Sequence, residues 1–262
     1  MISFLNIGPG RSGTTSFYSM CKKHPQINTG KLQEPSHNGY DLFDTEKYLE
    51  HWNYSNIDKN QRVLLLDASS RFTMVENIIH FKKYLSPYVN KFQHVCLVRD
   101  LKKFYISVIY YKIILNCDIT EIDLKNVEKL LDFKVNDEMY NHIKSRSLTD
   151  HMLSVRNVFN EDEIFILPIE FFNEYKVNLF NFLEIDYIDL KYCKRNNLFT
   201  ELGSINKLKI EPKNRILFLK LYSLIENRVE KNKILNELLS KELKMVDKLC
   251  NTKLYHCYQR RN

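Results

Sequence analysis

Four short hydrophobic runs recur along the first two thirds of the chain, separated by segments of mixed polarity. Each run is short and almost continuously apolar, without the alternation of a strand that is exposed on one face. Such runs are typical of parallel strands that are covered on both faces of a sheet. They lie at residues 3–7, 62–67, 94–99 and 163–168.

The segments around these runs carry apolar residues at helical spacing. They predict helices over residues 14–24, 73–85, 102–115 and 147–159. We expect Lys22 and Lys23 in the last turn of the first helix, before Pro25. Because strands and helices alternate, the sequence predicts an α/β fold: a three-layer, P-loop NTPase-like central parallel β-sheet flanked by helices.

The last third of the chain has a different pattern. Residues 211–249 read as two long amphipathic C-terminal helices, with Pro212 in the first turn. Residues 118–146 are polar and fit an insert or lid as well as a plain surface helix. With 262 residues, of which 44% are hydrophobic, and only six glycines and six prolines, we expect a single domain over 1–262.

The formal net charge of +7 suits an anionic ligand, although a basic surface without a partner fits equally well. The six cysteines show no metal-type spacing with histidine, which predicts reduced thiols in an intracellular protein. The first strand begins almost at Met1, and no apolar run approaches the roughly 20 residues of a membrane span. We therefore expect a cytoplasmic protein without a membrane partner. Trp52 fits the core or the wall of an acceptor cleft.

A glycine-rich turn follows the first predicted strand in the stretch "FLNIGPGRSGTTSFYSM". Its glycines allow a tight turn, and the helix that opens at Thr14 and Thr15 points free amides and a positive dipole at one spot. A nucleotide-hydrolysing P-loop has a lysine directly after its last glycine, where this chain has Thr14. The nearby cation is Arg11. The turn therefore predicts a phosphate site of another kind.

A second candidate anion site follows the third predicted strand. Arg99 ends that strand, and Ser107 lies two helical turns further on, so the two side chains can face one anion. Taken alone, the same residues fit an ordinary junction between a strand and a helix.

Together the two stretches resemble the cytosolic and carbohydrate sulfotransferases that use 3′-phosphoadenosine 5′-phosphosulfate (PAPS). "GRSGTT" is similar to their 5′-phosphosulfate loop, and Arg99 with Ser107 matches their R-x7-S signature for the 3′-phosphate, although Leu101 replaces a common proline. The resemblance spans most of residues 2–185. It implies PAPS as donor, PAP as product and no metal. The implied donor-binding residues are Gly10, Arg11, Ser12, Gly13, Thr14, Thr15, Arg99 and Ser107.

The resemblance also implies the catalytic residues. Glycan-acting relatives place a glutamate in a K-E-P-H-like segment, and Glu34 with Pro35 in "KLQEPSH" is similar to it. Glu34 is thus the expected general base, and His37 is the alternative. Arg11 is expected to stabilise the charge on the leaving phosphate. Lys207, in a basic loop before the C-terminal helices, fits a contact to the 3′-phosphate or a solvated charge.

These observations predict an enzyme that transfers the sulfuryl group of PAPS to a hydroxyl of a small-molecule or glycan acceptor, preferably a sugar. Two alternatives stay open. One is a magnesium-dependent P-loop small-molecule kinase, which would need a lysine in place of Thr14 and a dedicated metal carboxylate. The other is a non-catalytic PAP-binding protein of the same fold. We expect no nucleic-acid partner, because no aromatic–basic recognition motif is present.

Overall fold

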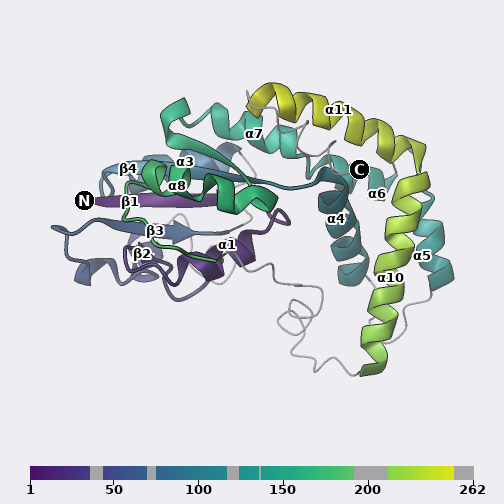
Figure 1. Ribbon diagram of the computed structural model, residues 1–262, viewed down its shortest axis with the longest axis horizontal. Coiled ribbons are helices and arrows are strands. Elements are labelled where there is room, and N and C mark those ends of the chain that lie inside the picture. The colour runs from purple at the N-terminus through teal and green to yellow at the C-terminus, as the bar shows by residue number, and fades with distance from the viewer. Residues whose placement is uncertain (36–43, 70–74, 117–123, 136, 192–211, 251–262) are drawn as a thin grey trace. The chain divides into compact units, whose positions relative to one another are not determined.

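The computed structural model of the chain describes residues 1–35, 44–69, 75–116, 124–135, 137–191 and 212–250 (Figure 1). The chain divides into two compact units. The first comprises Met1–Arg99 and Leu148–Lys194, and the second comprises Asp100–Ser147 and Arg195–Asn262. The single domain over 1–262 stays a prediction.

A parallel sheet forms the centre of the first unit. Its five described strands follow the order β2-β3-β1-β4-β5, with parallel pairing throughout. The strands are β1 (Ile2–Gly8), β2 (Ile27–Asn28), β3 (Val63–Asp67), β4 (Lys91–Val98) and β5 (Ile164–Pro168). The predicted α/β fold with a central parallel sheet is confirmed. The carboxyl ends of β1, β3 and β4 lie side by side at one edge, as the register shows.

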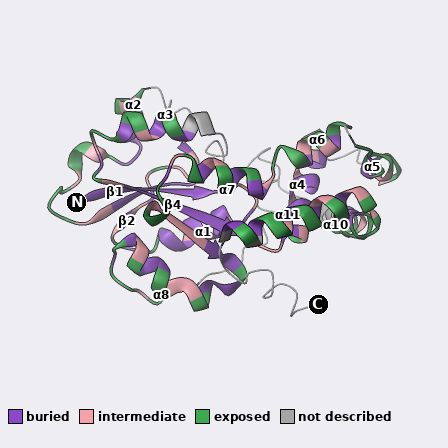
Figure 2. Cartoon of the chain, turned by 90° about the horizontal axis from the view of Figure 1, so that it is seen from above, coloured by how far each residue is buried: buried purple, intermediate pink, exposed green. Residues whose placement is uncertain are grey.

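Helices cover both faces of this sheet, as Figure 2 shows. One face packs against α1 (Thr14–Cys21) and α8 (Phe172–Leu183), and the other packs against α2 (Thr45–Glu50), α3 (Val75–Leu85) and α7 (Leu148–Arg156). The described part of the unit also contains three 3₁₀ turns, η2 (Tyr54–Asn56), η4 (Glu161–Glu163) and η5 (Ile169–Phe171). Because both faces are covered, the central strands β1 and β4 are almost entirely buried, which explains their largely apolar sequences.

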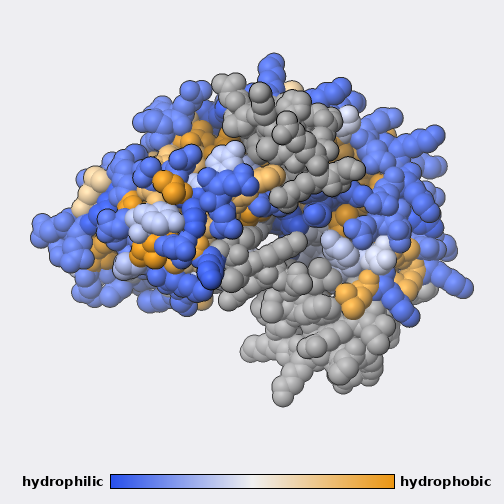
Figure 3. Space-filling view, viewed as in Figure 1, coloured by the Kyte–Doolittle hydropathy of each residue, from blue (hydrophilic) through white to orange (hydrophobic). Residues whose placement is uncertain are grey.

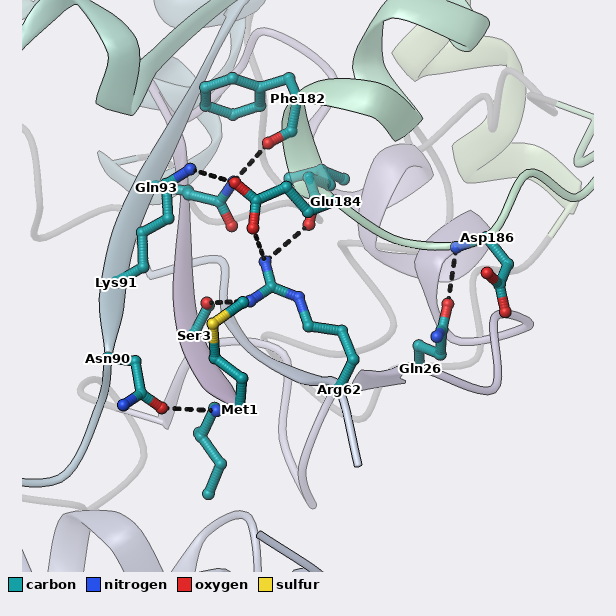
Figure 4. A network of polar contacts seen from close by, with 12 residues as sticks. Met1, Ser3, Gln26, Arg62, Asn90, Lys91, Gln93, Phe182, Glu184 and Asp186 are labelled. Atoms are coloured by element: carbon teal, nitrogen blue, oxygen red, sulfur yellow. Dashed lines mark hydrogen bonds and ion pairs between the residues drawn. The ribbon is translucent and has the colours of Figure 1, made fainter. Parts of the chain in front are cut away.

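The amino-terminal edge of the sheet is fastened to α8 by a polar network (Figure 4). The guanidinium group of Arg62 donates hydrogen bonds to Ser3 Oγ at 2.8 Å and to the carbonyl of Leu183 at 2.9 Å. Arg62 also pairs with Glu184 at 3.1 Å, and Lys91 pairs with the same carboxylate at 2.6 Å. The network fixes the end of α8 at the edge opposite the glycine-rich loop.

The second unit consists of helices in its described part. They are α4 (Leu101–Asn116), α5 (Leu124–Leu131), α6 (Glu138–Lys144), α10 (Pro212–Lys231) and α11 (Lys233–Cys250). Ion pairs link α4 to α10 through Lys102 and Glu230, and α4 to α6 through Lys112 and Glu138. The two predicted C-terminal helices are confirmed, and Pro212 opens the first of them. The polar segment 118–146 contains α5 and α6.

The structure differs from the sequence-based prediction at several places, among them the end of α1, the end of α7 at Arg156, and the unpredicted elements α2 and β2. Helix α1 ends at Cys21 and not at His24, so Lys22 and Lys23 lie beyond its last turn. The backbone N–H groups of Lys23 and His24 bond three residues back, which tightens the chain before Pro25. Strand β2 was not predicted, because two residues carry no readable period.

Trp52 lies in the core, which is one of the two positions predicted for it; the other was the wall of an acceptor cleft. Its side chain is 1% exposed and packs edge-on against Phe4 and Tyr48. The indole Nε1 donates a hydrogen bond to the carbonyl of Leu66 at 3.2 Å, so its polar atom is also satisfied. Trp52 therefore packs as part of the core on the α2 face.

On the face shown in Figure 3, hydrophilic side chains cover most of the described surface, and hydrophobic ones form small groups between them. Among the described residues, no helix has both the length and the apolar character that crossing a membrane requires.

Candidate active site

The glycine-rich loop connects β1 to α1 at the carboxyl edge of the sheet (Figure 1). Gly13 precedes the helix with a φ of 108°, a left-handed conformation that glycine adopts without strain. No side chain caps the helix, and its first turn contains no acidic residue. The amides of Thr14 and Thr15 thus keep the positive end of the helix dipole available to an anion.

The loop is stabilised from within by Ser12. Both its backbone N–H and its hydroxyl donate to the carbonyl of Pro9, and the side chain is fully buried. The hydroxyl proton of Ser12 is therefore used by the loop itself. Gly10, Arg11 and Thr15 are half-buried. These positions leave the backbone amides and the Arg11 cation as the groups that suit a bound phosphate.

Arg99 lies directly against this loop. It follows the last residue of β4, and its Nη1 donates a hydrogen bond to the carbonyl oxygen of Arg11 at 3.1 Å. The two residues are 88 positions apart in the sequence. The parallel order of β1 and β4 brings them together, because the carboxyl ends of neighbouring parallel strands share one edge. The structure thus places Arg99 beside the glycine-rich loop at one edge of the sheet.

Ser107 lies on α4, where it is half-buried. Because α4 belongs to the second unit, the joint action of Arg99 and Ser107 stays a prediction from their spacing. Lys207 and His37 lie outside the described residues, so their predicted roles also rest on sequence alone.

The segment that carries Glu34 is held beside the loop by its neighbour Gln33. The side-chain Nε2 of Gln33 donates to Thr15 Oγ1 at 3.0 Å, and its backbone carbonyl accepts from the backbone N–H of Ala68 at 3.3 Å. Glu34 itself is half-buried. These contacts fix the segment between the start of α1 and the end of β3. Nothing in the local sequence pattern around Gln33 indicated these contacts.

A buried carboxyl group ends β3. Asp67 is completely buried, and burial raises its pKa from 3.8 to about 6. Its oxygens accept hydrogen bonds from the Tyr48 hydroxyl and from the backbone N–H of Ser69, which oppose the rise. Burial and the nearby carboxylate also raise the pKa of Tyr48. Asp67 is thus a titratable carboxyl group close to the segment that Gln33 anchors.

Comparison with family models and with curated proteins found no match. Among solved structures, the chain is similar to a sulfotransferase from Alicyclobacillus acidocaldarius, with a TM-score of 0.50 and 13% identity over 89% of this chain and 95% of the other. A sulfotransferase domain of the Synechococcus PCC 7002 olefin synthase matches with a TM-score of 0.44 and 14% identity, over 86% and 93% of the two chains. Mouse sulfotransferase SULT7A1 complexed with PAP matches with a TM-score of 0.41 and 17% identity, over 91% of this chain and 87% of the other.

The last two similarities are too low to add to the argument. The first, with a TM-score of 0.50, supports the overall α/β fold. At 13% identity it informs on the fold and not on the reaction. The chain has the fold of the sulfotransferases.

Proposed function

We propose that the chain is a sulfotransferase that moves the sulfuryl group of PAPS to a hydroxyl group of a sugar or glycan. The observation that carries this proposal is the hydrogen bond from Arg99 to the carbonyl of Arg11 in the glycine-rich loop. It joins an arginine at a strand end to an uncapped helix start, which suits a ligand with two anionic groups. The fold supports the same conclusion.

In this proposal the loop amides and Arg11 hold the 5′-phosphosulfate, and Arg99 holds the 3′-phosphate. Thr14 stands where a triphosphatase has its lysine, so the loop lacks the cation that a γ-phosphate needs. A sulfuryl group carries less charge than a terminal phosphate and needs no bridging metal. This difference favours PAPS over ATP and argues against the kinase alternative. Ser107 and Lys207 are further proposed contacts to the 3′-phosphate.

The proposed reaction is an in-line displacement at sulfur. The acceptor oxygen forms a bond to sulfur while the bond from sulfur to the 5′-phosphate oxygen breaks, and PAP leaves with the electron pair. Glu34 takes the proton of the acceptor hydroxyl, and Arg11 with the loop amides stabilises the charge on the leaving phosphate. The anchoring of Gln33 to Thr15 supports this role, because it holds the Glu34 segment beside the loop. His37 is the alternative base.

The donor site is tested by calorimetry with 3′,5′-ADP, 5′-AMP and ATP in the absence of magnesium. We expect 3′,5′-ADP to bind more tightly than either of the others. Arg99→Ala should weaken 3′,5′-ADP binding by about 10- to 150-fold, the equivalent of a lost charge-assisted hydrogen bond. It should weaken 5′-AMP binding much less, because there only the hydrogen bond to the loop carbonyl of Arg11 is lost. Arg146→Ala is the matched control, since Arg146 is an exposed arginine that belongs to neither of the two predicted anion motifs. Equal losses for both nucleotides would contradict the 3′-phosphate assignment.

The reaction is tested by transfer from radiolabelled PAPS to a panel of sugars, phenols and alcohols. Glu34→Gln should abolish transfer and keep 3′,5′-ADP affinity, because only the proton acceptor is removed. Full activity of this variant would disprove Glu34 as the base, and His37→Ala would then be measured. Tight 3′,5′-ADP binding without transfer to any acceptor would support the non-catalytic alternative.

A further inference from the structure

Three side chains with metal-binding atoms meet in the core of the first unit. His94 and Cys96 lie on β4, two residues apart, so both point to the same face of the sheet. His151 lies on α7, which packs against that face. All three side chains are buried, and their ligand atoms lie within 4.8 Å of one another. The sequence pattern does not reveal this group, because His151 is 57 positions from His94.

The spacing of the two imidazoles fits a tetrahedral ion. Nε2 of His94 lies 3.3 Å from Nε2 of His151. Two nitrogens at zinc-bond distance on a tetrahedral ion are also about 3.3 Å apart. Two imidazoles and one thiol form a donor set that suits Zn²⁺, whereas Mg²⁺ and Ca²⁺ prefer oxygen ligands. A hydrogen bond between the rings alone would explain the distance but would not explain the third ligand atom.

Unpartnered polar atoms surround the same spot. Asn6 on β1 pairs in register with His94, so the two side chains lie next to each other on one face. The amide of Asn6 is 2% exposed, and neither its oxygen nor its nitrogen has a hydrogen-bond partner among the described residues. The Nδ1 atoms of His94 and His151 also lack partners there. The unpartnered amide of Asn6 points to an ion or an ordered water as its ligand, whereas each Nδ1 lies across its ring from the Nε2 that would bind the ion.

The group lies directly behind the start of the glycine-rich loop. A Cβ atom added to Gly8 would approach Cε1 of His151 to 2.9 Å and Cε1 of His94 to 3.7 Å. An ion at this place would therefore join β4 to α7 at the end of β1, where the loop begins. Such an ion would stabilise the fold of the first unit and would not contact the sulfuryl group of the proposed reaction.

We propose that His94, Cys96 and His151 bind one structural Zn²⁺ ion, with a water molecule held by Asn6 as the fourth ligand. The site fastens α7 to β4 behind the loop. Metal binding of this kind contributes directly to the free energy of folding, since the unfolded chain has no preformed site. The proposal is independent of the proposed sulfuryl transfer.

The test is the zinc content of the full chain, purified without a histidine tag from zinc-supplemented cells and measured by inductively coupled plasma mass spectrometry. We expect about one zinc ion per chain, as for any single structural site. The Cys96→Ser and His151→Asn variants should each contain much less zinc than the wild type. Cys21→Ser is the matched control, because Cys21 is a buried thiol on the opposite face of the sheet and should leave the zinc content unchanged.

Two further measurements do not depend on how well the variants fold. Co²⁺ added to the metal-stripped wild-type chain should produce the charge-transfer absorption of a cobalt–thiolate bond. The same chain should melt at a higher temperature with Zn²⁺ than with chelator, because an ion that binds the folded state alone stabilises it. Wild-type protein without zinc and without the cobalt band would overturn the proposal. So would zinc that is retained by both the Cys96→Ser and the His151→Asn variants.

Discussion

Asp67→Asn should remove a pH-dependent part of the stability of this protein. Asp67 is completely buried at the end of β3, and its pKa is raised from 3.8 to about 6. Because the folded state holds the proton more tightly than the unfolded state, this group contributes stability below pH 3.8. That contribution is lost as the pH rises through about 6. Asparagine has no proton to lose, so the variant lacks this dependence.

The size of the effect follows from the difference between the two pKa values. A difference of about two units corresponds to about 3 kcal/mol in the free energy of unfolding. Relative to the variant, the wild type should therefore lose about 3 kcal/mol between about pH 4 and pH 8. The amide that the substitution introduces can still accept from the N–H of Ser69 and donate to the hydroxyl oxygen of Tyr48, which keeps the local hydrogen bonds.

The assay is urea unfolding followed by circular dichroism at several pH values, with the difference between variant and wild type plotted against pH. Subtraction removes the titration of all other groups that the two proteins share. Asp162→Asn serves as the control for the change in net charge, since Asp162 is exposed. A difference that stays constant from pH 4 to pH 8 would refute the assignment of a raised pKa to Asp67.

Two further predictions concern stability. Arg62→Ala should lower the free energy of unfolding by about 2–3 kcal/mol, because it leaves buried Ser3 and the carbonyl of Leu183 without a charged donor. In the same urea titration Lys91→Ala should cost at most about 1 kcal/mol, since its ion pair is partly exposed, and equal losses would speak against the network. Gly30→Ala should cost more than the roughly 1–2 kcal/mol of a left-handed residue. Gly30 has a φ of 63°, and a Cβ there would lie 2.1 Å from buried His51. A melting temperature within about 2 °C of the wild type would contradict this expectation.

Local sequence patterns determined most of the elements of the fold. Four of the five described strands were predicted, because a strand buried on both faces needs a continuous apolar run. The helices after β1 and β4 and the two C-terminal helices followed from apolar residues three and four apart. The glycine-rich turn was equally readable, since the left-handed Gly13 and the helix start at Thr14 depend on adjacent residues.

Contacts between distant parts of the chain were decided by the tertiary structure. From the sequence, only the family resemblance suggested that Arg99 and the glycine-rich loop act together. The hydrogen bond from Arg99 to Arg11 follows from the neighbouring positions of β1 and β4 in the sheet. The contact of Gln33 with Thr15 was not predicted, and neither was the meeting of His94 and Cys96 with His151. The spacing of apolar residues along a helix or a strand depends only on residues that are close in sequence, so it does not predict contacts between distant segments. Which strand lies beside which, and which helix covers which face, depends on how the whole chain buries its apolar surface.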